Sequence, residues 1–241
     1  MKKLRNALKG KKFIAFLDFE GTQFSHEMIA IGAIFVSLNK DGTIKNRKKP
    51  FKIYVQAKNK IGNYVTELTG INEKLLQDKG VSFDTAMKEL KKYIGVNFNR
   101  SIFMTFGNHD LRILNQSISY NFVFPKEICS NIQKNYVDFA SIFSEFVRDE
   151  KGNTLSLVHA CELYGVPLFG EPHQPEVDAV NLANLYDAFI KNKELTLDKY
   201  KFAITKTNHL PEPIDRIMKK LAKGEDVTND EYETFLKDYI D

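Results

Sequence analysis

The chain has 241 residues, 43% of them apolar, and a formal net charge of +4. This length suits one large domain, or one domain with an appendage, and the apolar content is sufficient for a core. No segment approaches the roughly 18 to 20 apolar residues of a membrane span, and the basic N-terminus lacks the apolar stretch of a signal peptide. Cys129 and Cys161 show neither metal-ligand spacing nor a disulfide framework. We therefore expect a cytoplasmic protein with no membrane partner.

Charge is unevenly spread along the chain. One basic cluster lies within residues 2–12 and a second within residues 45–49, whereas the last seventeen residues hold seven acids against Lys237 alone. Basic patches attract polyanions such as nucleic acid, but similar clusters are common on solvated loops. The sequence leaves both interpretations open.

The first element breaks its own hydrophobic pattern. Five apolar residues, Phe13 to Leu17, run directly into Asp18 and Glu20. A short run rich in Phe and Ile predicts a buried strand, and the alternation of a strand puts both acidic side chains on one face. Two like charges are costly to bury there, so a hard divalent cation such as Mg²⁺ is the natural partner. The alternative is that the strand ends before Asp18 and that both acids are solvated.

Two more strands and a divided helix follow. Residues 28–38 form an apolar, β-branched run, and Asn39–Gly42 is a hairpin turn signal. Alternation over residues 51–56 predicts a returning strand, so three antiparallel strands are expected. Gly70 divides a helical segment that extends from Val65 to Leu76.

Helices and strands then alternate. Ser82 is a suitable N-cap for a helix that reaches about Tyr93. The later elements are a strand at 101–107, a helix at 111–120, a short strand at 136–139, and helices at 140–147, 155–164 and from Pro175 to about Phe189. This order predicts an α/β fold with a mixed β-sheet flanked by helices.

A change of composition near residues 191–195 predicts a boundary. We expect one domain over residues 1–195 and a helical C-terminal extension over residues 196–241. Pro213 begins one helix, and Thr228 with Glu231 forms a capping box for another. The last helix carries an apolar stripe that needs a partner, either the domain itself or a second subunit: Tyr232, Phe235, Leu236, Tyr239 and Ile240.

His173 and Asp178 form a further candidate pair. Residues five apart in an ideal helix point roughly 140° away from each other. Pro175, however, suits the first helical position, with Gln174 as the cap before it. His173 then lies in the entry loop and Asp178 in the first turn, where the two side chains can converge. The positive end of the helix dipole would also favour an ionised Asp178.

Four carboxylates and one histidine at the ends of elements around a sheet suit two-metal phosphodiester cleavage. Two Mg²⁺ ions about 4 Å apart can clamp the attacking and leaving oxygens, and a histidine can take the proton of the attacking water. Asp138 competes with Asp110 for the place of the third acid, and we prefer Asp110 because it follows the longer core strand. His109 is either a substrate contact or simply exposed.

Three segments resemble the motifs of the DEDDh (DnaQ-like) 3′-5′ exonucleases, which have a ribonuclease H-like fold: Phe13–Glu20, Thr105–Leu114 and His173–Ala179. Glu67–Ile71 matches a further family segment, which lines the groove for the terminal nucleotide. The similarity covers about residues 13–189 and does not include the C-terminal extension. The histidine five residues before Asp178 distinguishes the chain from relatives that have tyrosine there.

The resemblance implies a role for each matched residue. Asp18, Glu20, Asp110 and Asp178 would bind two Mg²⁺ or Mn²⁺ ions, and His173 would be the general base. The residues expected to contact the substrate are Gly21, Thr22, Thr69, Ile71 and His109.

The second motif, residues 106–110, is more similar to the ERI-type exoribonuclease branch than to the proofreading branch. Phe106 stands where the ERI-type branch commonly has tryptophan, and Pro175 is less usual at its position than alanine. Neither residue is at a ligand position. We expect a metal-dependent 3′-5′ exonuclease that acts on single-stranded RNA or DNA ends, with RNA favoured, and releases nucleoside 5′-monophosphates. The alternatives are a proofreading or repair DNA exonuclease, and a nucleic-acid-binding adaptor without chemistry. An adaptor would have lost an acid, and none is missing.

Overall fold

The structure is a computed structural model that describes residues 2–205 and 210–240. Its strands are β1 (Phe13–Gly21), β2 (Met28–Leu38), β3 (Ile44–Arg47), β4 (Phe51–Tyr54), β5 (Ser101–Thr105) and β6 (Tyr136–Asp138). Within the described residues they form one six-stranded sheet in the order β3-β2-β1-β5-β6, and β4 also pairs with β2. The strand β1 is antiparallel to β2 and parallel to β5, so the sheet is mixed, as the sequence predicted.

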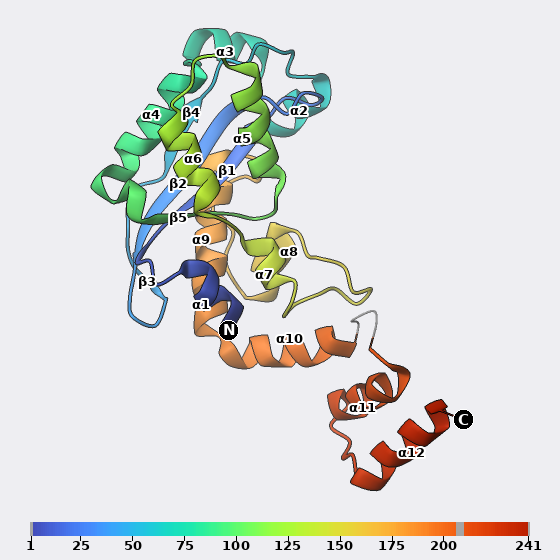
Figure 1. The fold of residues 1–241 in the computed structure, drawn as a ribbon. Helices are drawn as coiled ribbons and strands as arrows, with labels where there is room; N and C mark the ends of the chain where they lie inside the picture. The colour runs from blue at the N-terminus through green and yellow to red at the C-terminus, as the bar shows by residue number, and fades with distance from the viewer. Residues whose placement is uncertain (1, 206–209, 241) are drawn as a thin grey trace.

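Helices cover both faces of this sheet (Figure 1). In the described residues they are α1 (Lys2–Leu8), α2 (Asn63–Thr69), α3 (Glu73–Lys79), α4 (Phe83–Ile94), α5 (His109–Tyr120), α6 (Lys126–Lys134), α7 (Phe139–Phe143), α8 (Leu157–Leu163), α9 (Pro175–Lys191), α10 (Lys193–Thr205), α11 (Glu212–Ala222) and α12 (Asn229–Ile240), with a 3₁₀ helix at Gly95–Arg100. The helices α4, α5 and α6 pack on one face, and α7, α8 and α9 pack on the other. None of the described helices is long and apolar enough to cross a membrane.

The alternation of β1 decides where its acids point. Ile14 and Phe16 belong to the core on the α9 side, whereas Leu17 and Phe19 belong to the core on the α5 side. Asp18 and Glu20 continue the first series, so both acids face α9. The prediction that the strand continues through them on a single face is confirmed, because β1 ends at Gly21.

Gly32 of β2 lets α9 approach the sheet closely. It lies opposite Asp18 of β1 on one side and opposite Lys52 of β4 on the other. A Cβ atom at Gly32 would lie 1.9 Å from the backbone carbon of Pro175. The first turn of α9 therefore rests on the bare backbone of β2, between Asp18 and Lys52, and an isolated glycine inside a strand is typical of such an approach.

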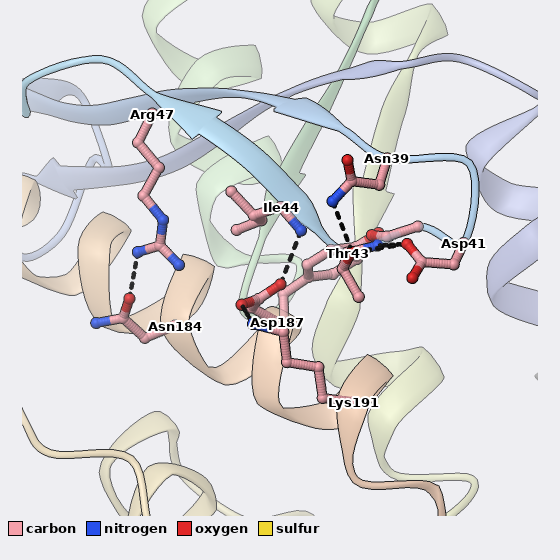
Figure 2. Close-up of polar contacts among 10 residues, drawn as sticks. Asn39, Asp41, Thr43, Ile44, Arg47, Asn184, Asp187 and Lys191 are labelled. Atoms are coloured by element: carbon pink, nitrogen blue, oxygen red, sulfur yellow. Dashed lines mark hydrogen bonds and ion pairs between the residues drawn. The ribbon is translucent and has the colours of Figure 1, made fainter.

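The edge of the sheet differs from the prediction. Instead of one returning strand at 51–56, two short strands, β3 and β4, pair with successive parts of β2. Pro50 precedes β4 and lacks an N–H group, so the pairing is interrupted there. Figure 2 shows how β3 is held on α9: Asp187 accepts a hydrogen bond from the Ile44 N–H (2.7 Å), and Arg47 donates to Asn184.

Two α-helices before residue 192 were not predicted. In α1, Leu4 and Leu8 are buried, and in α6, Ile128 and Ile132 are buried. Both pairs have the i, i+4 spacing of an apolar helix face, but each helix is too short for this signal to stand out.

The helix α10 crosses the boundary predicted at residue 195. Its Thr196 is buried, and the hydroxyl groups of Thr196 and Tyr164 lie 2.8 Å apart. This helix therefore packs on the preceding domain, although the domain division itself stays a prediction.

Beyond α10, α11 and α12 form a helix pair away from the sheet (Figure 1). The capping box is confirmed, because Thr228 and Glu231 exchange side-chain to backbone hydrogen bonds of 3.2 and 3.1 Å. Of the apolar stripe, Phe235 packs beneath Arg216 of α11, 5.6 Å from the ring centroid. The side chain of Ile240 lies outside the described residues.

Candidate active site

Three acids gather at the carboxyl edge of the parallel pair β1 and β5. Asp18 and Glu20 come from the end of β1, and Asp110 comes from the first turn of α5, shortly after β5. Asp110 is only 6% exposed, and its Oδ1 accepts a hydrogen bond from the Phe19 N–H at 2.7 Å. This bond fixes Asp110 against the backbone between the two acids of β1.

The entry to α9 adds His173 and Asp178. The helix begins at Pro175 with Gln174 as its N-cap residue, so the predicted placement of His173 in the loop and Asp178 in the first turn is confirmed. The His173 N–H donates to Asp178 Oδ2 at 2.9 Å. His173 has a left-handed backbone, with φ of 63°. Such a conformation is unfavourable for a residue other than glycine and is a frequent sign of a functional site.

Ionisation of the four acids is linked. Burial raises the pKa of Asp18 well above its ordinary value, and the charges of Asp110, Glu20 and Asp178 raise it further. Burial and the charges of Asp178 and Asp110 raise the pKa of Glu20 to about 7. Burial also raises the pKa of Asp110 to about 7. These carboxylates are therefore close enough to oppose one another's ionisation.

Asp178 departs from one expectation. The helix dipole was expected to favour its ionised form, but burial raises the pKa of Asp178 above the ordinary value. The N–H group and the charge of His173 act in the opposite direction. Desolvation therefore outweighs the favourable groups at the N-terminus of α9.

The chemistry of this donor set fits a hard divalent cation. All four side chains offer carboxylate oxygens, the ligands that Mg²⁺ prefers, and a cation among them would replace repulsion by attraction. Within residues 2–205 and 210–240, no three His, Cys, Asp or Glu side chains are already close enough together to form a metal site. Asp110 and Asp178 instead direct an oxygen at a backbone N–H group.

A fifth acid and a lysine, both missed from sequence, complete the site. Lys52 Nζ lies 3.0 Å from Glu176 Oε2 and also donates to Gln174 Oε1. The charge of Glu176 raises the pKa of Asp18, whereas the charge of Lys52 lowers the pKa of Glu20. Alternation along β4 placed Lys52 on a defined face, but nothing local indicated that α9 would lie on that face.

The predicted substrate residues surround this edge. Thr22 is 1% exposed, and its hydroxyl accepts a hydrogen bond from the Glu27 N–H at 2.9 Å. Thr69 and Ile71 are also buried, and Gly21 ends β1. His109 is exposed, with its ring edge-on to His26 at 5.2 Å. Their contacts with a nucleotide stay predictions.

A hydrogen bond joins the Thr69 segment to the entry of α9. Gln174 Nε2 donates to the Thr69 carbonyl at 3.1 Å. Since Gln174 also accepts from Lys52, its amide links the predicted nucleotide groove to the Lys52–Glu176 ion pair and to the loop that carries His173.

Two exposed aromatic side chains stand at the same edge. Phe24, in the loop after β1, is 82% exposed, and Tyr64 of α2 is 62% exposed. The Gln23 N–H donates to the Ile61 carbonyl at 2.8 Å, so the two segments are joined. Sequence reasoning could not separate these rings from the many core phenylalanines.

Asp138, the competing third acid, has a different structural role. Its Oδ1 accepts hydrogen bonds from the N–H groups of Ser141, at the start of α7, and of Gly107, at 3.1 and 3.0 Å. This use as a helix cap supports the choice of Asp110, and the metal-binding role of Asp110 stays a prediction.

Solved structures of nucleases share this architecture. The nuclease domain of 3′hExo, a DEDDh family member bound to rAMP, is 18% identical with a TM-score of 0.61, over 76% of this chain and 94% of that one. Cell-death related nuclease 4 is 20% identical with a TM-score of 0.60, over 75% of this chain and 64% of that one. E. coli Exonuclease I in complex with a dA16 oligonucleotide is 13% identical with a TM-score of 0.57, over 86% of this chain and 45% of that one. None of the curated protein sequences matches the chain significantly.

The sheet, its helices and the acids at its edge thus define a protein with the ribonuclease H-like fold of these exonucleases. The family model described as Exonuclease (RNase_T) matches residues 15–186. The chain belongs to this exonuclease family.

Proposed function

We propose that the chain is a metal-dependent 3′-5′ exonuclease that releases nucleoside 5′-monophosphates from the 3′ ends of single-stranded nucleic acid. One observation carries the proposal. The first turn of α9 rests on Gly32, and this contact brings His173 and Asp178 to the edge that already holds Asp18, Glu20 and Asp110. The direction of attack comes from the family resemblance.

The four carboxylates would hold two Mg²⁺ or Mn²⁺ ions, which when bound supply electrostatic stabilisation of the attacking and leaving oxygens. His173 is exposed at the rim of the site and takes the proton of the attacking water. Its backbone N–H holds Asp178, so one residue both orients an acid and presents a base. Phe24 and Tyr64 present aromatic faces on which terminal bases stack.

RNA is the favoured substrate. The proposal rests on the similarity of residues 106–110 to the ERI-type branch, and a structurally similar nuclease domain is bound to rAMP. A proofreading or repair DNA exonuclease is the alternative, because E. coli Exonuclease I in complex with a DNA oligonucleotide has the same fold. Relative rates on RNA and DNA oligonucleotides of matched sequence separate the two.

The test of the chemistry uses 5′-labelled single strands with Mn²⁺ or Mg²⁺. The parent protein should shorten them stepwise from the 3′ end, whereas EDTA, Asp18→Ala and His173→Ala should each abolish or strongly slow the shortening. Digestion unchanged by all three would contradict the assignment. Tight strand binding without turnover in Mn²⁺ would instead identify a nucleic-acid-binding adaptor.

Two expectations outside the site complete the proposal. The chain acts in the cytoplasm, and α12 offers a surface for a second copy or another protein, since Tyr232 and Tyr239 on its apolar stripe remain partly exposed. Light scattering of the full chain measures the second expectation directly.

A further inference from the structure

Cations from several separate segments of the chain line one pocket. This pocket, with a volume of about 890 Å³, lies at the end of the sheet where β1 begins. Its cations come from residues 5–12, from the β2–β3 turn, from the start of β3 and from the start of α10. We call this feature the basic pocket, and five of its cations form no hydrogen bond or close ion pair within the described residues: Arg5, Lys12, Lys40, Lys45 and Lys193.

The charge of the basic pocket is largely uncompensated. Among the described residues, none of these five side chains makes a hydrogen bond or an ion pair, whereas Lys11 of the same pocket is engaged by Asn135 and the Ser101 carbonyl. Asp41 is the acid among the lining residues, and it accepts hydrogen bonds from the N–H and hydroxyl of Thr43 at 2.9 and 2.6 Å. Five cations thus face one acid, Asp41, whose charge interacts with that of Lys193.

The walls of the basic pocket are held rigidly. Its floor is apolar and includes buried Leu4 and Leu38. The β2–β3 turn, which carries Lys40, and the start of β3, which carries Lys45, are fastened to α9, because Tyr186 donates to the Gly42 carbonyl at 2.9 Å and Asp187 accepts from the Ile44 N–H. Figure 2 shows the Asp187 contact together with the ion pair between Asp187 and Lys191. Because the backbone is already fixed, only the side chains have to be ordered when an anion binds.

The basic pocket and the candidate active site lie at opposite ends of α9. Asp178 stands in the first turn of this helix, and Ile190, which lines the pocket, stands in the last. Ile190 is twelve positions after Asp178, which corresponds to about 18 Å along the helix axis. Leu38 in the pocket and Asp18 in the site belong to the same face of the sheet, which α9 covers. A strand of a few nucleotides can bridge such a distance, since single-strand sites extend over roughly 4 to 16 nucleotides.

We propose that the basic pocket is a second binding site for the nucleic-acid substrate, which holds backbone phosphates several nucleotides from the 3′ end. The inference rests on the proposed function, which places that 3′ end at Asp18 and His173. Phosphates suit a rim of cations, and a base or sugar suits an apolar floor. The pocket makes the enzyme favour strands long enough to reach both ends of α9.

The test variant is Lys40→Glu/Lys45→Glu/Lys193→Glu. Its matched control is Lys88→Glu/Lys91→Glu/Lys92→Glu, which makes the same change of charge on exposed positions of α4, on the other face of the sheet. A second variant, Lys40→Arg/Lys45→Arg/Lys193→Arg, keeps the charge. Thermal unfolding checks that each variant is folded.

Binding is measured by fluorescence anisotropy in EDTA on an Asp18→Asn background, with labelled single-stranded RNA of 20 and of 4 nucleotides. We expect the pocket variant to bind the 20-mer at least tenfold more weakly at about 0.1 M salt. The slope of log affinity against log salt concentration should become less steep by about 2, or about 0.7 for each of the three lost phosphate contacts. The 4-mer should bind as before. The control and arginine variants should resemble the parent.

Equal affinity of the pocket variant and the parent for the 20-mer would overturn the proposal. A variant that changes only its oligomeric state in light scattering would also overturn it, and would identify the pocket as a site for a protein such as the acidic C-terminal helix of a second copy. Because binding is measured without turnover, these outcomes are distinct from a failure of the exonuclease assay, which would contradict the proposed function instead.

Discussion

Substitution of Gly32 by alanine tests how the candidate site is assembled. The added Cβ would lie 1.9 Å from the Pro175 carbon and 2.3 Å from the Glu176 nitrogen, and both are backbone atoms. An ordinary contact requires about 3.5 Å, so the start of α9 must withdraw by roughly 1.5 Å. This movement carries His173 and Asp178 away from the acids of β1.

This displacement should lower both the unfolding free energy and the reaction rate. Overpacking at a buried position costs about 1–3 kcal/mol of unfolding free energy. A misplacement of about 1 Å in a catalytic group can cost about 100-fold in rate. We therefore expect Gly32→Ala to remain folded, with a lower midpoint of thermal unfolding, and to lose about two orders of magnitude in the single-turnover rate constant.

Single-turnover degradation of a labelled strand at saturating Mn²⁺ measures the rate, and thermal unfolding measures the stability. Ala183→Gly, in the interior of the same helix, is the control, because it costs about 1 kcal/mol without moving the first turn. If Gly32→Ala retains a rate within about twofold of the parent, then the contact between α9 and β2 does not position the catalytic groups.

Three further predictions concern charge at the site. In the folded protein the pKa values of Glu20 and Asp110 are about 7, above the ordinary 4.5 and 3.8. The unfolded chain therefore loses these two protons at lower pH than the folded protein does. The unfolding free energy of metal-free protein, measured by urea titration, should fall as pH rises from about 4 to 7. Asp110→Asn keeps an acceptor for Phe19 and removes a charge, so in EDTA at pH 8 it should raise the unfolding midpoint while abolishing nuclease activity. Lys52→Met should lower the unfolding free energy by about 1–2 kcal/mol, less than for a fully buried ion pair because Glu176 is partly exposed. Lys52→Arg should retain most of the stability of the parent.

Four of the five acids at this edge could be selected from the sequence, because each lies beside a recognisable local signal. Asp18 and Glu20 interrupt an apolar strand, Asp110 follows another strand, and Pro175 marks the start of a helix. Each signal is contained in fewer than ten residues, and parallel strands bring their carboxyl ends together without further information.

The missed features depend on contacts between distant segments. Lys52 and Gln174 are 122 residues apart, so no local pattern indicates that they meet. Gly32 was visible as a glycine inside an apolar run, which suggests a close backbone approach, but the approaching segment could not be identified from β2 alone. The basic pocket was missed for the same reason, since its cations come from segments that only the packing of α1, the β2–β3 hairpin and α10 brings together.

Metal affinity and stability are linked at this site, which gives a measure independent of turnover. Five acids face one lysine, so the metal-free folded state carries repulsion that the extended unfolded chain largely avoids. A cation that binds only the folded state at 100 times its Kd raises the unfolding free energy by about 2.7 kcal/mol. Mn²⁺ should therefore raise the unfolding midpoint of the parent at pH 8 and have little effect on a variant in which Asp18 and Asp110 are both asparagine. A parent protein with no Mn²⁺-dependent shift would contradict the metal site, even if nucleic acid still bound.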